Sequence, residues 1–168
     1  AAHTHAQAGP TITPIYAHRG AQAFEVLREA TEAYIARVGQ RPQAFLATMG
    51  PLTQHKNRAD FATAFLAVGG IETIYPAGFT TTDEAADATL TSGAKIVVIC
   101  STDPTYPKLV PPLAQKLKQA NPSLTVLLAG YPADHVEAFK AAGVDDFIHL
   151  NANCQNLLST LQKKMGIA

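Results

Sequence analysis

The sequence is poor in cysteine, in charge and in long apolar runs, and each shortage excludes a class of protein. The two cysteines lie far apart and outside any Cys/His cluster, so neither a disulfide framework nor a zinc site is supported. Charged residues make up only 15% of the chain, and 13 basic residues balance 13 acidic ones. With no net charge, the chain has no field that favours binding to nucleic acid or to a membrane surface. No apolar run is long enough to span a bilayer.

The first ten residues, AAHTHAQAGP, lack the basic start and apolar middle of a signal peptide, and no initiating Met precedes them. We therefore expect a cytoplasmic protein and a chain that is part of a longer one. Its 168 residues, of which 47% are hydrophobic, suffice for one domain whose sheet is covered on both faces.

Short apolar or β-branched segments alternate with helical patterns from Gly39 onward, and Gly, Pro or Asn marks each change. This alternation predicts βαβ units. The predicted strands are residues 43–48, 72–75, 95–100, 124–129 and 146–150. Five such units in one domain predict a flavodoxin-like, doubly wound α/β fold with a parallel sheet of strand order 2-1-3-4-5.

Two local patterns locate helix starts. Thr81 and Glu84 form a capping box that opens the second helix of the sheet domain. Pro107, Pro111 and Pro112 predict the first turn of the third, where a missing N–H costs little.

A helix is also predicted before the sheet domain, because an apolar stripe recurs there at helical spacing. The stripe consists of Phe24, Leu27, Thr31, Tyr34, Ile35 and Val38. This helix either packs on its own domain or docks against a neighbouring one. We accordingly divide the chain into a linker with an N-terminal helix (residues 1–40) and the sheet domain (residues 41–168).

Ligands of an open parallel sheet bind outside the carboxyl ends of its strands, so the loops there are the candidate site. Residues 41–72, RPQAFLATMGPLTQHKNRADFATAFLAVGGIE, resemble the first βα unit of the cobalamin-binding domain of methylmalonyl-CoA mutases, and more closely that of the non-catalytic small subunit. Residues 17–34, AHRGAQAFEVLREATEAY, are similar to the segment that links the mutase barrel to this domain. The resemblance covers nearly the whole chain.

In cobalamin-binding members of the family, the loop after the first strand carries Asp-x-His-x-x-Gly. The resemblance implies that the His ligates cobalt, that the Asp fixes its other ring nitrogen, and that the Gly leaves room for the nucleotide tail. Here the His is His55, but the Asp position is Thr53 and the Gly position is Arg58. Thr53 brings no charge, and the side chain of Arg58 would enter the path of the tail.

Two further family signatures are altered at the same edge. Ser-x-Leu after the third strand is Ser101-Thr102-Asp103 here, so a carboxylate replaces the Leu. Gly-Gly after the fourth strand is Gly130-Tyr131, and we expect the tyrosine ring to fill the slot that a second glycine would leave open. The Gly-rich turn after the fifth strand is replaced by HLNAN at residues 149–153. These changes converge on one pocket and predict that it is closed.

The resemblance thus implies a degenerate cobalamin-binding domain with a structural or assembly role, inactive on its own. It implies no catalytic residue, a vestigial cofactor site at His55, Ser101 and Gly130, and no bound cofactor or metal. The alternative is a working cobalamin domain in which His55 ligates cobalt.

By the same resemblance, the parent assembly is an adenosylcobalamin-dependent isomerase that converts methylmalonyl-CoA to succinyl-CoA. The large catalytic subunit, which carries the cofactor, is the implied partner in a heterodimer. The second implied partner is the barrel of the chain's own longer form. Such a barrel needs about 250 residues, so these 168 residues cannot contain it.

Other activities of this topology find less support. A receiver domain needs an acidic pair after the first strand, where this chain has Thr48-Met49-Gly50. A flavodoxin needs a Ser/Thr-rich phosphate loop at that place, whereas Thr80-Thr81-Thr82 follows the second strand. Ser101 lacks the Gly-x-Ser-x-Gly setting of a hydrolase nucleophile, and we expect it to cap the turn after the third strand.

Overall fold

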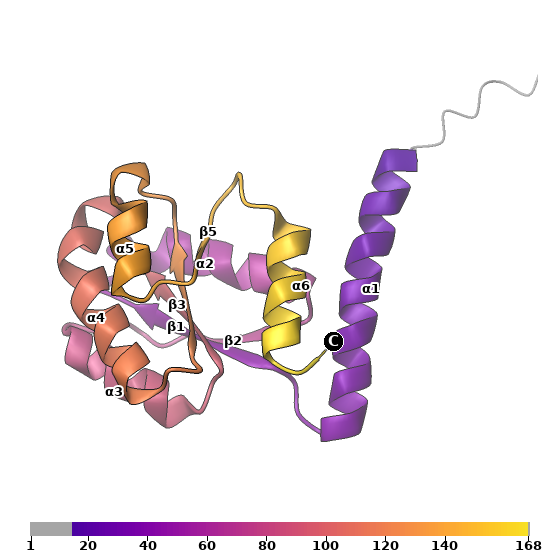
Figure 1. The fold of residues 1–168 in the computed structure, drawn as a ribbon, viewed down its shortest axis with the longest axis horizontal. Helices are drawn as coiled ribbons and strands as arrows, with labels where there is room; N and C mark the ends of the chain where they lie inside the picture. Colours follow the sequence, from indigo (N-terminus) through magenta and orange to yellow (C-terminus); the bar gives the residue numbers. More distant parts are fainter. Residues whose placement is uncertain (1–14, 168) are drawn as a thin grey trace, which may run out of the picture.

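The computed structural model describes residues 15–167, with side chains from residue 22 onward. Its centre is a five-stranded parallel sheet of order β2-β1-β3-β4-β5, which confirms the predicted fold (Figure 1). The strands are β1 (Gln43–Thr48), β2 (Glu72–Ile74), β3 (Ile96–Cys100), β4 (Thr125–Ala129) and β5 (Asp146–Ile148). Strand β1 has the predicted bounds, and the others are one or two residues shorter than predicted.

Helices cover both faces of the sheet (Figure 1). They are α1 (Ile15–Val38), α2 (Leu52–Val68), α3 (Thr82–Ser92), α4 (Tyr106–Ala120), α5 (Val136–Ala142) and α6 (Cys154–Lys164), with the short 3-10 turns η1 (Asp103–Thr105) and η2 (Ala133–His135). Helices α2 and α6 pack on one face, and α3, α4 and α5 pack on the other. Among the described residues, no helix has both the length and the apolarity to cross a membrane.

The core has two halves because successive strand residues face opposite sides of the sheet. Val98 and Leu127 belong to the half under α2 and α6, whereas Val97 and Leu128 belong to the half under α4. All four side chains are fully buried. The central strands are therefore apolar at every position, as a sheet covered on both faces requires.

Helix α1 packs on the domain's own α6 and α2 (Figure 1). Leu27 is buried in this contact, and Phe24 and Tyr34 pack at its margin. A polar chain runs through it, in which Gln162 Nε2 donates to Thr31 Oγ1 at 3.0 Å and Thr31 donates to the Gly69 carbonyl oxygen at 2.6 Å. Of the two readings of this helix, the structure supports packing on its own domain.

The start of α3 agrees with the predicted capping box, whereas the start of α4 differs from the prediction made from its prolines. Thr81 Oγ1 accepts from Glu84 N at 3.1 Å and caps α3. In α4, only Pro107 lies in the first turn, whereas Pro111 and Pro112 lie inside the helix. The carbonyls that these two prolines leave without an intrahelical donor belong to the exposed residues Pro107 and Lys108, where water can hydrate them.

Candidate functional site

His55 lies in the first turn of α2 and is fully buried. Its Nδ1 is 3.0 Å from the Gly50 carbonyl oxygen, so Nδ1 carries the proton and donates. Its Nε2 is the one buried side-chain nitrogen or oxygen that has no hydrogen-bond partner among the described residues. The loop after β2 covers the ring closely, because a Cβ on Gly78 would come within 3.0 Å of His55 Cε1. The ring therefore points into the protein and not into the space above the sheet.

The group that orients His55 is a backbone carbonyl and not a side chain at position 53. Thr53 lies exposed in the first turn of α2. An acidic residue would bond to Nδ1 in the family pattern, but here the Gly50 carbonyl oxygen takes that place. The edge of the Tyr75 ring lies on another side, with the ring centres 6.4 Å apart.

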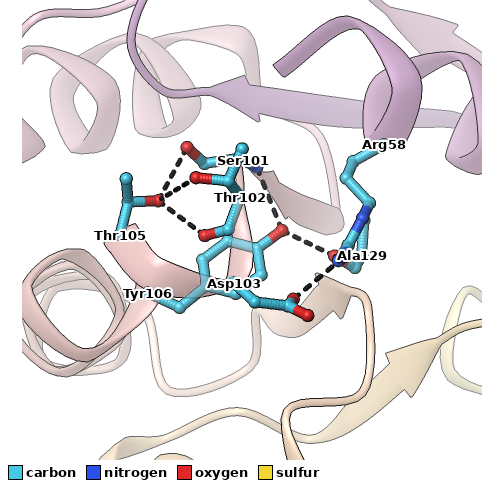
Figure 2. A network of polar contacts seen from close by, with 7 residues as sticks. All are labelled: Arg58, Ser101, Thr102, Asp103, Thr105, Tyr106 and Ala129. Carbon is cyan, nitrogen blue, oxygen red and sulfur yellow. Dashed lines mark hydrogen bonds and ion pairs between the residues drawn. The ribbon is translucent and has the colours of Figure 1, made fainter. Parts of the chain in front are cut away.

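Arg58 crosses the carboxyl edge of the sheet from α2 (Figure 2). Its Nη1 donates to the Ala129 carbonyl oxygen at 2.6 Å, and its Nη2 donates to Asp103 Oδ1 at 2.9 Å. The guanidinium lies directly over Gly130, where a Cβ would fall 1.9 Å from Nη1. The space above Gly130 is thus filled by an arginine that is bonded on two sides.

Tyr106, at the start of α4, links the ends of β3 and β4 at the same edge of the sheet (Figure 2). Its hydroxyl accepts from Ser101 N at 3.0 Å and donates to the Ala129 carbonyl oxygen at 2.5 Å. Burial raises the pKa of Tyr106, so the phenol keeps its proton as a donor. The Ser101 hydroxyl is buried and shares a hydrogen bond with the Thr105 hydroxyl, with the two oxygens 2.9 Å apart. Ser101 therefore holds the turn after β3 and has no activating base.

Tyr131 does not fill the slot beside Gly130, contrary to the sequence-based expectation. Its ring is half exposed and stacks on His149, with the ring centres 4.6 Å apart, while Phe147 meets its edge. Arg58 already occupies the space above Gly130, and the aromatic residues of β5 and the following loop offer the tyrosine a better contact. A groove of about 730 Å³ remains open between Gly130, Tyr131, Arg58 and the loop after β5, so Arg58 fills part of the predicted pocket and does not close it completely.

The thiols and the acidic residues offer no reactive or metal-binding centre. Burial raises the pKa of the Cys100 thiol at the end of β3, and also that of Cys154 at the start of α6. Both are therefore protonated at neutral pH, and Cys100 is packed in the core. Among the side chains of residues 22–167, no three His, Cys, Asp or Glu residues cluster as a metal site would need.

Curated relatives match almost the whole chain. The methylmalonyl-CoA mutase small subunit of Streptomyces virginiae is 31% identical over 147 residues, and that of Porphyromonas gingivalis is 32% identical over 157. A probable methylmalonyl-CoA mutase small subunit of Mycobacterium bovis is 35% identical over 159 residues, which is 94% of this chain. This chain is a homologue of one part of these small subunits. It spans about a quarter of their length, between 23% and 25%.

No protein-family model matches the chain. Solved structures agree on the fold alone. A CheY-like protein from Pseudomonas aeruginosa has a TM-score of 0.57 at 22% identity, covering 76% of this chain and 95% of its own. A two-component response regulator from Clostridium difficile has a TM-score of 0.51 at 12% identity, covering 75% and 97%.

The structure brings only some of the predicted site residues of this small-subunit homologue together. Arg58, Ser101 and Gly130 meet at the ends of β3 and β4, whereas His55 lies apart under the loop after β2. Sequence reasoning missed Tyr106, which links Ser101 to β4. The available signal was a tyrosine five residues after that serine, at the first position of a helix. The five-residue spacing alone does not predict this hydrogen bond, because the turn η1 between the two residues brings them together.

Proposed function

We propose that the chain is a structural and assembly domain of a methylmalonyl-CoA mutase small subunit, and that it binds no cobalamin itself. The whole protein would then serve an assembly that isomerises methylmalonyl-CoA to succinyl-CoA, with the cofactor and the chemistry in a large partner subunit. The barrel of the chain's own longer form would be its second partner. The domain itself contributes no catalytic residue in this proposal.

The ion pair between Arg58 and Asp103 is the observation that carries the proposal. Both residues stand where the sequence departs from the cobalamin-binding pattern, and their side chains meet at 2.9 Å. The positive charge that replaces a glycine is thereby neutralised by the negative charge that replaces a leucine. Because Nη1 also bonds to the Ala129 carbonyl oxygen, the guanidinium is held over Gly130, where the family's nucleotide tail would need open space.

His55 supports the same conclusion by its burial. A cobalt ligand has to present a nitrogen lone pair to the cofactor, and His55 Nε2 carries one without a partner. The unpartnered Nε2, unlike the burial of the ring, favours the alternative of a working cobalamin domain. Against it, the loop at Gly78 would have to move before any large ring system could reach the nitrogen.

The first prediction is that hydroxocobalamin keeps its visible spectrum when the 168-residue chain is added at micromolar concentration. The expected spectrum is the same as with the His55→Ala variant, because the nitrogen is enclosed. The measurement is an absorbance titration of both proteins. A shift to a histidine-ligated spectrum that disappears in His55→Ala would establish the alternative function.

The second prediction is that the site reopens only when several positions change together. Thr53→Asp, Arg58→Gly and Tyr131→Gly each restore one residue of the cobalamin-binding pattern, and Arg58→Gly is the change that clears the space above Gly130, so their effects on binding are expected to be non-additive. We expect no spectral shift with any single variant and a shift with the triple variant. Lys56→Gly is a matched control, because it carries the same cost of about 1 kcal/mol for glycine in α2 without clearing Gly130. Tight cobalamin binding by Arg58→Gly alone would mean that the arginine is the sole barrier.

A further inference from the structure

A second cavity lies at the carboxyl ends of β1 and β3, beside the start of α4. It has a volume of about 310 Å³, and its walls come from Gly50, the start of α2, Thr80 and the residues that open α4. The strand order reverses between β1 and β3, and ligands of doubly wound sheets bind at such a switch point. This cavity shares no lining residue with the groove beside Gly130.

The charge in this cavity is positive and uncompensated. Lys108, in the first turn of α4, is the single ionisable residue of its lining. The residue is exposed, and it has no ion-pair partner among the described side chains, residues 22–167. By contrast, Lys56, Lys116 and Lys118 each meet a carboxylate within 2.9 Å or less. An anion entering the cavity therefore finds one available ammonium group and no carboxylate to repel it.

Three further polar side chains line the cavity, from Gln54, Thr80 and Thr105. The Gln54 carboxamide lies against Gly50, where a Cβ would come within 2.0 Å of its Oε1. The Thr80 hydroxyl is exposed beside it, on the loop between β2 and α3. Thr105 already donates its proton within the turn after β3, at 2.7 Å to the Thr102 carbonyl oxygen. The Thr80 hydroxyl and the Lys108 ammonium are therefore the lining donors available to the acceptor oxygens of an oxyanion.

We propose that this cavity binds a phosphate group, either free or as the ester of a small molecule, with Lys108 as its charged contact. Free phosphate alone leaves much of the cavity empty, and the volume lies at the small end of the range of about 300–1,000 Å³ for small-molecule sites. A small ester such as glycerol 3-phosphate is therefore expected to bind more tightly than inorganic phosphate. This site is independent of the proposed assembly role.

The test is an NMR titration of the ¹⁵N-labelled 168-residue chain with inorganic phosphate and, separately, with glycerol 3-phosphate, at constant ionic strength. We expect amide shifts at Gly50, Gln54, Thr80 and Thr105. The Lys108→Gln variant is expected to lower the affinity by about tenfold, which is the effect of one charge-assisted hydrogen bond. Glycerol 3-phosphate as the tighter probe identifies an ester as the ligand, and equal affinities identify the phosphate group alone.

Lys163→Gln is the matched control, because Lys163 is also exposed and loses the same charge at the far end of α6. The proposal requires that this variant keep the affinity of the original chain. An equal loss in both variants would mean non-specific attraction to the net charge and would overturn the site. Shifts spread over the surface, or absent at Thr80 and Thr105, would overturn it as well.

Discussion

Replacing Val98 with aspartate is expected to unfold the domain. Val98 is the middle residue of the central strand β3 and has no exposed surface. Its neighbours across the sheet are Leu46 on β1 and Leu127 on β4, so no cation is available to pair with a carboxylate there. Burying an unpaired charge costs several kcal/mol, a large part of the roughly 5–15 kcal/mol that stabilises a domain. Circular dichroism and thermal melting of the purified variant measure the effect.

Val26→Asp is the control for this experiment, since it makes the same chemical change at a side chain that is 63% exposed on α1. Surface substitutions of this kind change the free energy of unfolding by about 0.5 kcal/mol or less. We expect Val26→Asp to melt like the original chain. A folded Val98→Asp variant with unchanged melting would contradict the position of β3 at the centre of the sheet.

The sheet could be predicted from the sequence because its signals are local. Segments such as residues 95–100, KIVVIC, are short, β-branched and apolar throughout, and glycine or proline separates them from helical patterns. Short length, β-branched residues and flanking glycine or proline favour a strand buried on both faces for such a segment. The strand order was then predicted from the size of the domain, since five such units are typical of a flavodoxin-like sheet. The errors are confined to strand ends, where hydrogen bonding and not composition decides.

The site was less predictable, because its contacts join residues far apart in sequence. The sequence predicted that Arg58 would enter the space of the tail, and in the structure its guanidinium lies over Gly130. It did not reveal that Asp103, 45 positions away, would hold the arginine there. The sequence also predicted that Tyr131 would fill that space, whereas in the structure its ring stacks on His149. Side-chain direction at a strand end depends on which neighbour occupies the space first, and periodicity carries no information on that choice.

The burial of His55 has a similar origin. Sequence reasoning placed this residue in the loop after the first strand, through the Asp-x-His-x-x-Gly pattern of the family. In the structure α2 begins at Leu52, so His55 lies on the first helical turn and faces inward. A glycine at position 78 with φ of 138° lets the loop after β2 pass across the ring. The loops after β1 and β2 together enclose the His55 ring, and the sequence of either loop alone does not predict its burial.

Removing α1 is the second change with a large expected effect. A chain that begins at Gly39 loses Leu27, which is 6% exposed, together with the partly buried rings of Phe24 and Tyr34. It also leaves the Gln162 side chain without Thr31, its hydrogen-bond partner across the interface. The lost apolar burial and hydrogen bonding together are on the order of 5 kcal/mol. We therefore expect the truncated chain to be unfolded, or to melt far below the full chain.

Leu27→Asp tests the same contact without a deletion, and Val26→Asp is again its control one position along the helix. The exposed fractions of the two side chains, 6% and 63%, predict a large loss of stability for the first and almost none for the second. Sedimentation of each protein beside its thermal melt separates two roles of the helix. If α1 completes the core, stability falls and the full chain is monomeric. A truncated chain that melts like the full chain but no longer self-associates would instead assign α1 to a surface that binds a partner.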